Sequence, residues 1–386
     1  MVDRKHIPLF DLKLPSESLR EVHEVLASGW LNTGPKAAEL EKRIAAMVGV
    51  RYAVALNSAT AGLQLTLEAL GCGPGREVVT TPFTFAATSA AIIRAGAMPV
   101  FADIDPATLT IDPDEVARKI TSRTACVLPV DVAGHPADYP ELGDICDRKH
   151  VPLVADAAHS LGASVGRYSV DRLVDAAVHS FQATKNLTTA DGGMVVTRHK
   201  IIAERVRLLS QHAMTTNAYQ RSRSGRWAYD VLAPGLKANL SDVHAAIGLG
   251  QLAGFEKSQQ RREKIATRYC RKLADLSDFV AMPVVRDVYR HAWHLFIVRL
   301  HLSRLRIRRA RFIELMADAG IECGVHYRPL FEMSFYRQIG YTRQYFPNAA
   351  YAGERVVSLP LYPGLTNLQV DRVCEAVRSI ILRFRR

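Results

Sequence analysis

Residues 52–101 read YAVALNSATAGLQLTLEALGCGPGREVVTTPFTFAATSAAIIRAGAMPVF. Short runs rich in β-branched residues alternate here with longer runs in which apolar residues recur at helical spacing. The pattern predicts strands at 52–56, 77–80 and 98–101, and helices at 61–70 and 86–95. Because strand–helix–strand units connect parallel strands, the stretch indicates a mainly parallel sheet with helices on both faces.

The alternation continues on both sides of this stretch. Further helices are predicted at 17–28, 38–47, 113–120, 139–150 and 200–211, and further strands at 124–129, 152–155, 176–180 and 193–196. An Arg-rich stretch at 215–227 lacks apolar periodicity and predicts a loop. One or two long helices are expected at 241–273, followed by a strand at 294–300, a helix at 309–319, a strand at 323–327 and a helix at 368–384. We therefore expect an α/β fold with a large domain at 1–250 and a smaller C-terminal α+β domain at 251–386.

The composition excludes several protein classes. The chain has 386 residues, of which 48% are hydrophobic and 23% charged, so it is neither disordered nor fibrous. Its 50 Lys and Arg against 38 Asp and Glu give a net charge of +12, which favours anionic ligands and leaves nucleic acid, anionic membranes and phosphorylated small molecules open. The Arg-rich runs at 304–311 and 383–386 are typical of solvated faces.

The cysteines and the N-terminus indicate a cellular compartment. The six cysteines are widely spaced and form no C-x-x-C pair, which predicts reduced thiols with neither a metal site nor a disulfide framework. Charged residues stand where a signal peptide would need an apolar core, and no apolar run approaches the length of a membrane span. These features predict a cytoplasmic protein.

Two segments place polar groups at the carboxyl ends of predicted strands, where ligands of such sheets bind. In NSATAG (57–62), free backbone N–H groups at a helix start and the hydroxyls of Ser58 and Thr60 could bind a phosphate, although helix capping explains the same residues. In VADAAH (154–159), Asp156 ends an apolar strand and needs a partner. A protonated pyridine nitrogen, an arginine and a helix cap all qualify.

A third segment, HSFQATKN (179–186), is followed closely by a Gly-Gly turn. Lys185 lies after an apolar strand, where burial would lower its pKa enough for Schiff-base chemistry, while a surface lysine is the common alternative. Pyridoxal phosphate (PLP) needs such a lysine, a phosphate cup, a carboxylate and an aromatic face. Phe85 is the candidate aromatic, unless it is an ordinary core residue. The candidates occur in the order of a fold-type I PLP enzyme.

Several motifs together resemble the DegT/DnrJ/EryC1/StrS family of PLP-dependent nucleotide-sugar aminotransferases, from about residue 6 to the C-terminus. They are WLNTGPK (30–36), NSATAGL (57–63), TPFTFAAT (81–88), ADAAHSLGA (155–163), SFQATKNLTTADGG (180–193), PGLKANLSDVHAAIGLGQL (234–252) and GVHYRPL (324–330). The sequence is most similar to members that aminate C4 of a UDP-4-keto sugar, including the branch that forms UDP-4-amino-4-deoxy-L-arabinose.

The resemblance implies a role for each matching residue. Lys185 would form the Schiff base with PLP, Asp156 would pair with the pyridinium nitrogen, and Phe85 and His159 would enclose the ring. The groups implied in holding the phosphate are Ser58, Ala59, Thr60 and Ser180. The family works as a homodimer with shared active sites, which implies that Asn239 and Arg226 complete the neighbouring site. Candidates for the nucleotide sugar are Arg226, Lys237, His326 and Tyr327, and no metal is implied.

The predicted reaction transfers the amino group of L-glutamate to a nucleotide-linked keto sugar. The sequence departs from the family pattern at Ala155, at GLKAN (235–239) and at His212-Ala213, so the sugar cannot be copied from the nearest relative. Alternatives are C3 amination of a dTDP-keto sugar, a PLP-dependent sugar dehydratase, and a non-catalytic regulator that binds nucleic acid. Lys185 and the unclustered cysteines argue against the dehydratase, and no DNA-reading module is recognisable. We therefore expect neither nucleic acid nor a membrane as a partner.

Overall fold

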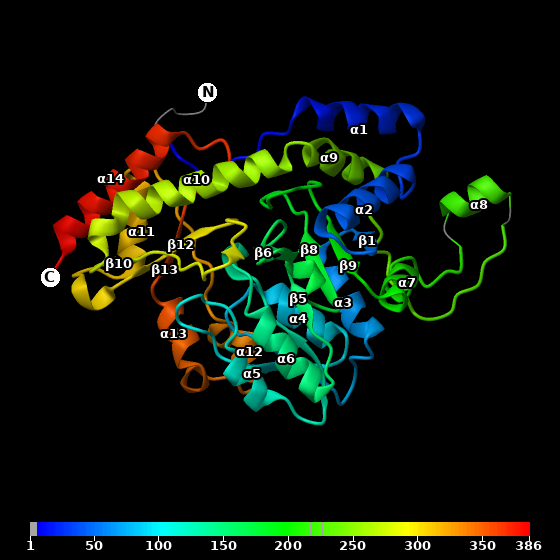
Figure 1. Ribbon diagram of the computed structural model, residues 1–386, viewed down its shortest axis with the longest axis horizontal. Helices are drawn as coiled ribbons and strands as arrows, with labels where there is room; N and C mark the ends of the chain where they lie inside the picture. The colour runs from blue at the N-terminus through cyan, green and yellow to red at the C-terminus, as the bar shows by residue number, and fades with distance from the viewer. Residues whose placement is uncertain (1–5, 217, 226) are drawn as a thin grey trace.

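A central seven-stranded sheet organises the larger part of the molecule. The structure is a computed structural model that describes residues 6–216, 218–225 and 227–386 (Figure 1). Four strands pair in the order β1 (Tyr52–Leu56), β9 (Gly193–Thr197), β8 (Ala176–Ser180) and β5 (Val154–Asp156), and three more in the order β3 (Met98–Phe101), β2 (Glu77–Thr80) and β4 (Thr124–Leu128). Parallel bridges from Val127 to Leu153 and from Val130 to Asp156 join the two groups. In this sheet β9 runs antiparallel to both neighbours, while the pairings of β5 with β8 and of β2 with β3 and β4 are parallel.

Helices cover both faces of the sheet, as the sequence predicted. They are α2 (Pro35–Val48), α3 (Ala59–Ala69), α4 (Ala86–Arg94), α5 (Pro113–Lys119), α6 (Tyr139–Lys149) and α7 (Lys200–Leu209). Successive side chains of a strand point to opposite faces. In β9, Met194 and Val196 accordingly belong to a core with α2 and α6, whereas Val195 belongs to a second core with α3 and α7. Two buried faces explain why these strands are continuously apolar.

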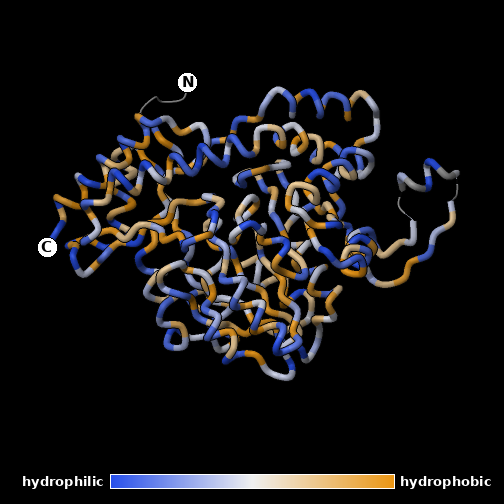
Figure 2. Tube along the Cα trace, in the orientation of Figure 1, coloured by the Kyte–Doolittle hydropathy of each residue, from blue (hydrophilic) through white to orange (hydrophobic). Residues whose placement is uncertain are grey.

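The C-terminal part has its own antiparallel sheet and core. Its sheet has the order β10 (Val280–Ala281), β12 (Phe296–Leu300) and β13 (Val356–Leu359), with the helices α10 (Phe255–Leu273), α11 (Arg309–Asp318) and α14 (Asn367–Phe384) packed around it. Hydrophilic and hydrophobic segments alternate along α10 and α14 (Figure 2), because each helix buries one side in this core. Ile7 from the N-terminal segment also packs here. None of the described helices is long and apolar enough to span a membrane.

Smaller elements connect the two parts. They are α1 (Ser16–Ser28), which lies along α9 (Asp242–Leu252), the small sheet of β6 (Ser164–Val165), β7 (Tyr168–Ser169) and β11 (Tyr289–Arg290), and the helices α12 (Ser334–Gln338) and α13 (Pro347–Gly353). Phe83, in the loop after β2, and Phe101 of β3 share a core with Phe331 and Phe346 beside α12 and α13. The predicted division at residue 250 falls in the last turn of α9 and stays a prediction.

Two elements predicted from the sequence are wrong. The stretch 215–227 contains the helix α8 (Ala218–Ser224), which projects from the body of the molecule in Figure 1. A projecting helix packs against no core, so its sequence has no apolar stripe at helical spacing. Such a stripe is the pattern from which the other helices are predicted. The strand predicted at 323–327 is reduced to one bridge between Gly324 and Ser358. His326 and Tyr327 leave the sheet there and line a cavity.

Candidate active site

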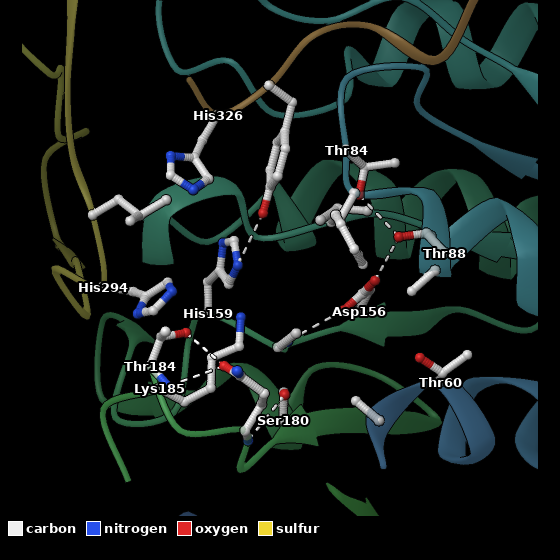
Figure 3. Close-up of a pocket in the computed structure, with 18 of the residues that line it drawn as sticks. Thr60, Thr84, Thr88, Asp156, His159, Ser180, Thr184, Lys185, His294 and His326 are labelled. Carbon is white, nitrogen blue, oxygen red and sulfur yellow. Dashed lines mark hydrogen bonds between the residues drawn. The ribbon is translucent and has the colours of Figure 1, made fainter. Parts of the chain in front are cut away.

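A cavity of about 460 Å³ lies at the carboxyl ends of β5 and β8 (Figure 3). The sequence-predicted residues that line it are Ser58, Ala59, Thr60, Phe85, Asp156, His159, Ser180, Lys185, His326 and Tyr327. Lys237 and Asn239 are not among the described residues that line it, and Arg226 lies outside the described residues. The fold thus brings together residues from five separate segments at the sheet edge where the sequence placed a ligand.

Asp156 is a buried carboxyl with two hydrogen-bond donors. Thr88 Oγ1 donates to Asp156 Oδ2 at 2.7 Å, and the Ala158 N–H donates to Oδ1 at 3.2 Å. Burial raises the pKa of Asp156, and the hydrogen bonds from Thr88 and Ala158 and the charge of Lys185 oppose that rise. A cationic ligand group at this carboxyl would relieve the cost of burying its charge.

A short relay supports this carboxyl. The Oγ1 atoms of Thr84 and Thr88 lie 2.9 Å apart. A hydroxyl has one hydrogen, and that of Thr88 is donated to Asp156. Thr84 must therefore donate to Thr88, so the two hydroxyls form a directed chain that ends on the carboxylate (Figure 3).

Lys185 lies in the turn after β8 and points into the cavity (Figure 3). Burial lowers its pKa to about 8, and the negative charge of Asp156 opposes that shift. Neighbouring groups fix the turn: the Lys185 N–H donates to the Gln182 carbonyl at 2.9 Å, and Asn186 Nδ2 donates to the Ala292 carbonyl at 2.8 Å. The turn that carries Lys185 is therefore held in place, and the amine is neutral far more often than that of an exposed lysine, as a nucleophile for a carbonyl requires.

A wall of aromatic rings faces Lys185. Tyr327 Oη lies 3.1 Å from His159 Nε2, and the rings of His159 and His294 have centroids 4.4 Å apart. Burial, followed by the charges of Lys185 and His326, holds the pKa of His159 well below its usual value, so the ring is neutral. Its Nδ1 atom is buried and has no hydrogen-bond partner among the described residues. A buried polar atom of this kind needs a partner from outside the described residues, such as a ligand or a water molecule.

His326 completes one side of the cavity. Its Nδ1 atom lies 2.8 Å from the Ser358 hydroxyl, and burial lowers its pKa to about 4. Phe85 lies on another side, immediately before α4, with 64% of its surface exposed. The alternative that Phe85 is an ordinary core aromatic is therefore wrong. Its ring lies 6.5 Å from that of Tyr327, and its exposed face is free to cover a planar ligand.

The N-terminus of α3 lines the cavity at the segment where the sequence predicted a phosphate cup. Ser58 is the N-cap, and its hydroxyl accepts from the Ala61 N–H, so the capping interpretation also holds for this residue. The N–H groups of Ala59 and Thr60 belong to the first turn, where a helix offers them no internal acceptor. Gly193, paired with Ser180 across β8 and β9, lets β9 approach closely: a Cβ there would lie 2.4 Å from the Ala59 nitrogen.

The geometry of the site fits PLP independently of the sequence motifs. A buried carboxyl, a lysine of lowered pKa, an orphaned imidazole nitrogen and an open helix N-terminus surround one cavity. They correspond to the pyridinium, aldehyde, ring face and phosphate of the cofactor, respectively. Alternative partners for Asp156 proposed from the sequence, an arginine or a helix cap, do not contact it among the described residues.

Sequence reasoning missed the supporting groups of the site. Thr84 and Thr88 were visible as hydroxyls four residues apart at the start of a predicted helix, which was a usable signal. His294 had no such signal, because it reaches His159 from a segment far along the chain.

Lys237 and Asn239 lie beside β1, where Lys237 Nζ donates to Asn239 Oδ1, and Asn239 Nδ2 donates to Asn32 Oδ1 at 3.1 Å.

Comparison with known proteins agrees with this site. The family model described as the DegT/DnrJ/EryC1/StrS aminotransferase family matches residues 13–378. The spore coat polysaccharide biosynthesis protein SpsC of Bacillus subtilis is 41% identical over 382 residues, which cover 98% of each chain. Spr1654 of Streptococcus pneumoniae, a sugar aminotransferase solved in a PLP form, has a TM-score of 0.92 at 31% identity, covering 98% of this chain and 99% of that one. DesI, solved with its TDP-sugar product, has a TM-score of 0.88 at 31% identity, covering 99% and 95%. The chain belongs to the DegT/DnrJ/EryC1/StrS family and is a PLP-dependent sugar aminotransferase of fold type I.

Proposed function

We propose that this protein transfers the amino group of L-glutamate, through PLP, to C4 of a UDP-linked 4-keto sugar. The observation that carries the proposal is the placement of Lys185 and Asp156 in one cavity at the open N-terminus of α3. The preference for C4 and for UDP comes from the sequence resemblance. The solved relative DesI was crystallised with a TDP-sugar, so both nucleotides belong in the test.

The residues of the cavity have separate tasks toward the cofactor. The N–H groups of Ala59 and Thr60, with the hydroxyls of Ser58, Thr60 and Ser180, would bind the phosphate. Asp156 would pair with the ring nitrogen, and Phe85 and His159 would enclose the ring. PLP, when bound, supplies an electron sink that makes the α-proton of an amino acid removable.

Lys185 moves the proton in this proposal. Its pKa of about 8 leaves a substantial fraction of the amine neutral near physiological pH, so Nζ can accept the α-proton of the donor and return it to a neighbouring carbon. The same atom later serves the keto sugar in the reverse direction. Tyr327 and His326 would contact the sugar, because they line the cavity opposite Lys185.

The cavity of one chain has few positive charges for such anionic substrates. Among the described residues that line it, Lys185 is the one lysine or arginine. A nucleotide diphosphate and the carboxylates of glutamate need more cationic partners than this. We therefore propose a homodimer in which Lys237, Asn239 and Arg226 complete the site of the neighbouring copy. The exposure of Leu19, at 65%, and of Trp227, at 86%, supports this interface.

An amino-transfer assay tests the reaction. The purified protein is incubated with glutamate and a panel of UDP-, dTDP- and GDP-linked keto sugars, and the products are identified by mass and by the position of the new amine. We expect amination at C4 of a UDP-sugar. Amination at C3 of a dTDP-sugar, or loss of a hydroxyl without amine incorporation, would replace the proposed reaction, and inactivity on all would refute the nucleotide-sugar assignment.

A complementation experiment tests the shared site. Lys185→Ala and Asn239→Ala are each expected to be inactive alone, with Lys185→Ala still able to bind PLP without a covalent link. In a mixed dimer, one of the two sites would receive both wild-type residues. Mixing the variants under subunit exchange is therefore expected to restore activity, and a mixture that stays inactive despite proven exchange would contradict the shared site.

A further inference from the structure

A second buried carboxyl, Asp131, lies beneath the site and has no role in the proposed reaction. It follows β4, is fully buried, and has no cationic side chain in hydrogen-bond contact among the described residues. Its Oδ1 atom accepts from the Ala137 N–H and from Tyr139 Oη, each at 2.8 Å, and its Oδ2 atom accepts from the Ser160 hydroxyl. A buried carboxyl that meets only neutral donors is costly and calls for an explanation.

The segment that begins with Asp131 contacts Asp156 and the His159 turn. The Asp131 N–H donates to the Asp156 carbonyl at 3.2 Å. Ser160, which Asp131 holds by its side chain, is the residue after His159. Gly134, three residues after Asp131, lies so close to this turn that a Cβ would stand 2.8 Å from the His159 carbonyl oxygen. The His159 backbone is therefore fixed from both sides by the same segment.

The same segment also holds His294. The Ala133 carbonyl accepts from the His294 N–H at 2.9 Å, and the Gly134 carbonyl accepts from the Ala292 N–H at 2.8 Å. His294 and His159 both line the cavity, with their ring centroids 4.4 Å apart (Figure 3). The segment 131–134 thus contacts the backbone near both His159 and His294, whose imidazole rings line the cavity.

We propose that Asp131 is a positioning residue, which acts through Ser160 to hold the His159 ring at the face of the cofactor, beside the His294 ring that the same segment holds through the Ala133 carbonyl. The proposal rests on the proposed function only in assigning the His159 face to PLP. If the turn is released, the His159 ring tilts or withdraws, and PLP loses part of its ring contact while the phosphate cup and Asp156 remain intact.

Two variants of the same carboxyl's partners separate positioning from stability. Ser160→Ala removes the hydrogen bond to Oδ2 on the His159 side, and Tyr139→Phe removes one to Oδ1 on the side of α6. Both delete one hydroxyl donor to one buried carboxyl, so a merely structural role predicts matched effects. A positioning role predicts that Ser160→Ala changes the binding of PLP and that Tyr139→Phe does not.

The measurements are the dissociation constant of PLP, the pH titration of the bound cofactor's absorbance, and the melting temperature. We expect Ser160→Ala to weaken PLP binding roughly twofold to tenfold, the size of one lost aromatic ring contact, and to shift the absorbance titration. Tyr139→Phe should lower the melting temperature comparably and leave both cofactor readouts near those of the wild type. Ser160→Thr, which keeps a hydroxyl, should recover at least part of the affinity.

The outcomes distinguish the two proposals. Equal cofactor behaviour in Ser160→Ala and Tyr139→Phe, with both folded, would overturn the positioning role. If the wild type failed to bind PLP, or if Lys185→Ala left its absorbance unchanged, the proposed function itself would fail.

Discussion

Replacing Thr88 with valine removes the donor at the end of the relay onto Asp156. Valine keeps the shape of threonine, so the change deletes one hydroxyl without opening a cavity. Asp156 Oδ2 then loses its partner at 2.7 Å, and the Thr84 hydroxyl loses its acceptor at 2.9 Å. Both Thr84 and Thr88 are at least 98% buried, so water does not readily replace either bond.

The expected magnitude follows from the charge of the acceptor. A hydrogen bond to a charged group contributes about 1.5–3 kcal/mol, and a loss of that size weakens PLP binding roughly tenfold to a hundredfold. The bond from Thr88 is also the leading influence that keeps the pKa of Asp156 from rising further. Without it, that pKa rises, Asp156 is protonated over a wider acidic range, and the acid limb of kcat/KM moves to higher pH.

The assay compares Thr88→Val with Thr88→Ser and Thr84→Val. Serine keeps the donor and should bind PLP like the wild type. Thr84→Val leaves the bond to Asp156 in place and removes only the group behind it, so its effect should have the same sign and be smaller. If Thr88→Val and Thr88→Ser show the same PLP affinity and the same acid limb, Asp156 does not depend on the relay and the reasoning is refuted.

Three further predictions concern other parts of the molecule. The rate at which the apoenzyme takes up PLP should rise with pH and level off above about 8, where Lys185 becomes neutral. Because the charge of Asp156 raises the pKa of Lys185, the rate of PLP uptake by Asp156→Asn should level off at lower pH. An uptake rate that does not depend on pH would contradict the assignment of Lys185 as the reacting amine. Gly193→Ala should weaken phosphate binding and destabilise the protein by about 1–3 kcal/mol, since its Cβ would lie 2.4 Å from backbone atoms, whereas Gly143→Ala, with open space around it, should do neither. Burial raises the pKa of Asp131 to about 7, above the value near 4 in an unfolded chain. Between these two pH values the folded state binds a proton that the unfolded state has lost. The contribution of Asp131 to the stability of the folded state therefore falls as pH rises from about 4 to about 7. Urea denaturation should therefore show that the free energy of unfolding of Asp131→Asn increases relative to that of the wild type as pH rises over that range. A difference in unfolding free energy that stays constant with pH would contradict this prediction.

The reactive residues could be predicted from the sequence because a local rule places them. Asp156 and Ser180 are the last residues of β5 and β8, and Lys185 follows in the next turn. Short apolar runs mark buried strands, and ligands of such sheets bind beyond the carboxyl ends. Strand position and residue type therefore sufficed for these groups. The same rule placed Phe85 just past β2, although its exposure was open until the structure settled it.

The supporting groups depend on contacts that no local pattern contains. Thr88 of the helix α4 reaches Asp156 at the end of the strand β5, and His294 lies beside His159 where the Ala133 carbonyl accepts its backbone N–H. Such contacts arise when distant elements pack, and hydrophobic periodicity does not specify which element meets which. The failure at 323–327 has the same origin, since His326 and Tyr327 leave the sheet after the bridge at Gly324 and line the cavity.

The two Arg-rich runs show how packing changes the meaning of charge. Each run has the exposed arginines expected of a solvated face. The structure joins them, because the Arg306 N–H donates to the Phe384 carbonyl at 2.8 Å and the Arg386 N–H donates to the Arg304 carbonyl at 2.9 Å. They meet at the C-terminal end of the long axis, away from β5 and β8 (Figure 1). Much of the net charge of +12 is therefore concentrated where it cannot line the cavity. Among the described residues that line the cavity, Lys185 is the one lysine or arginine, and this is the observation behind the proposed contribution of a neighbouring copy.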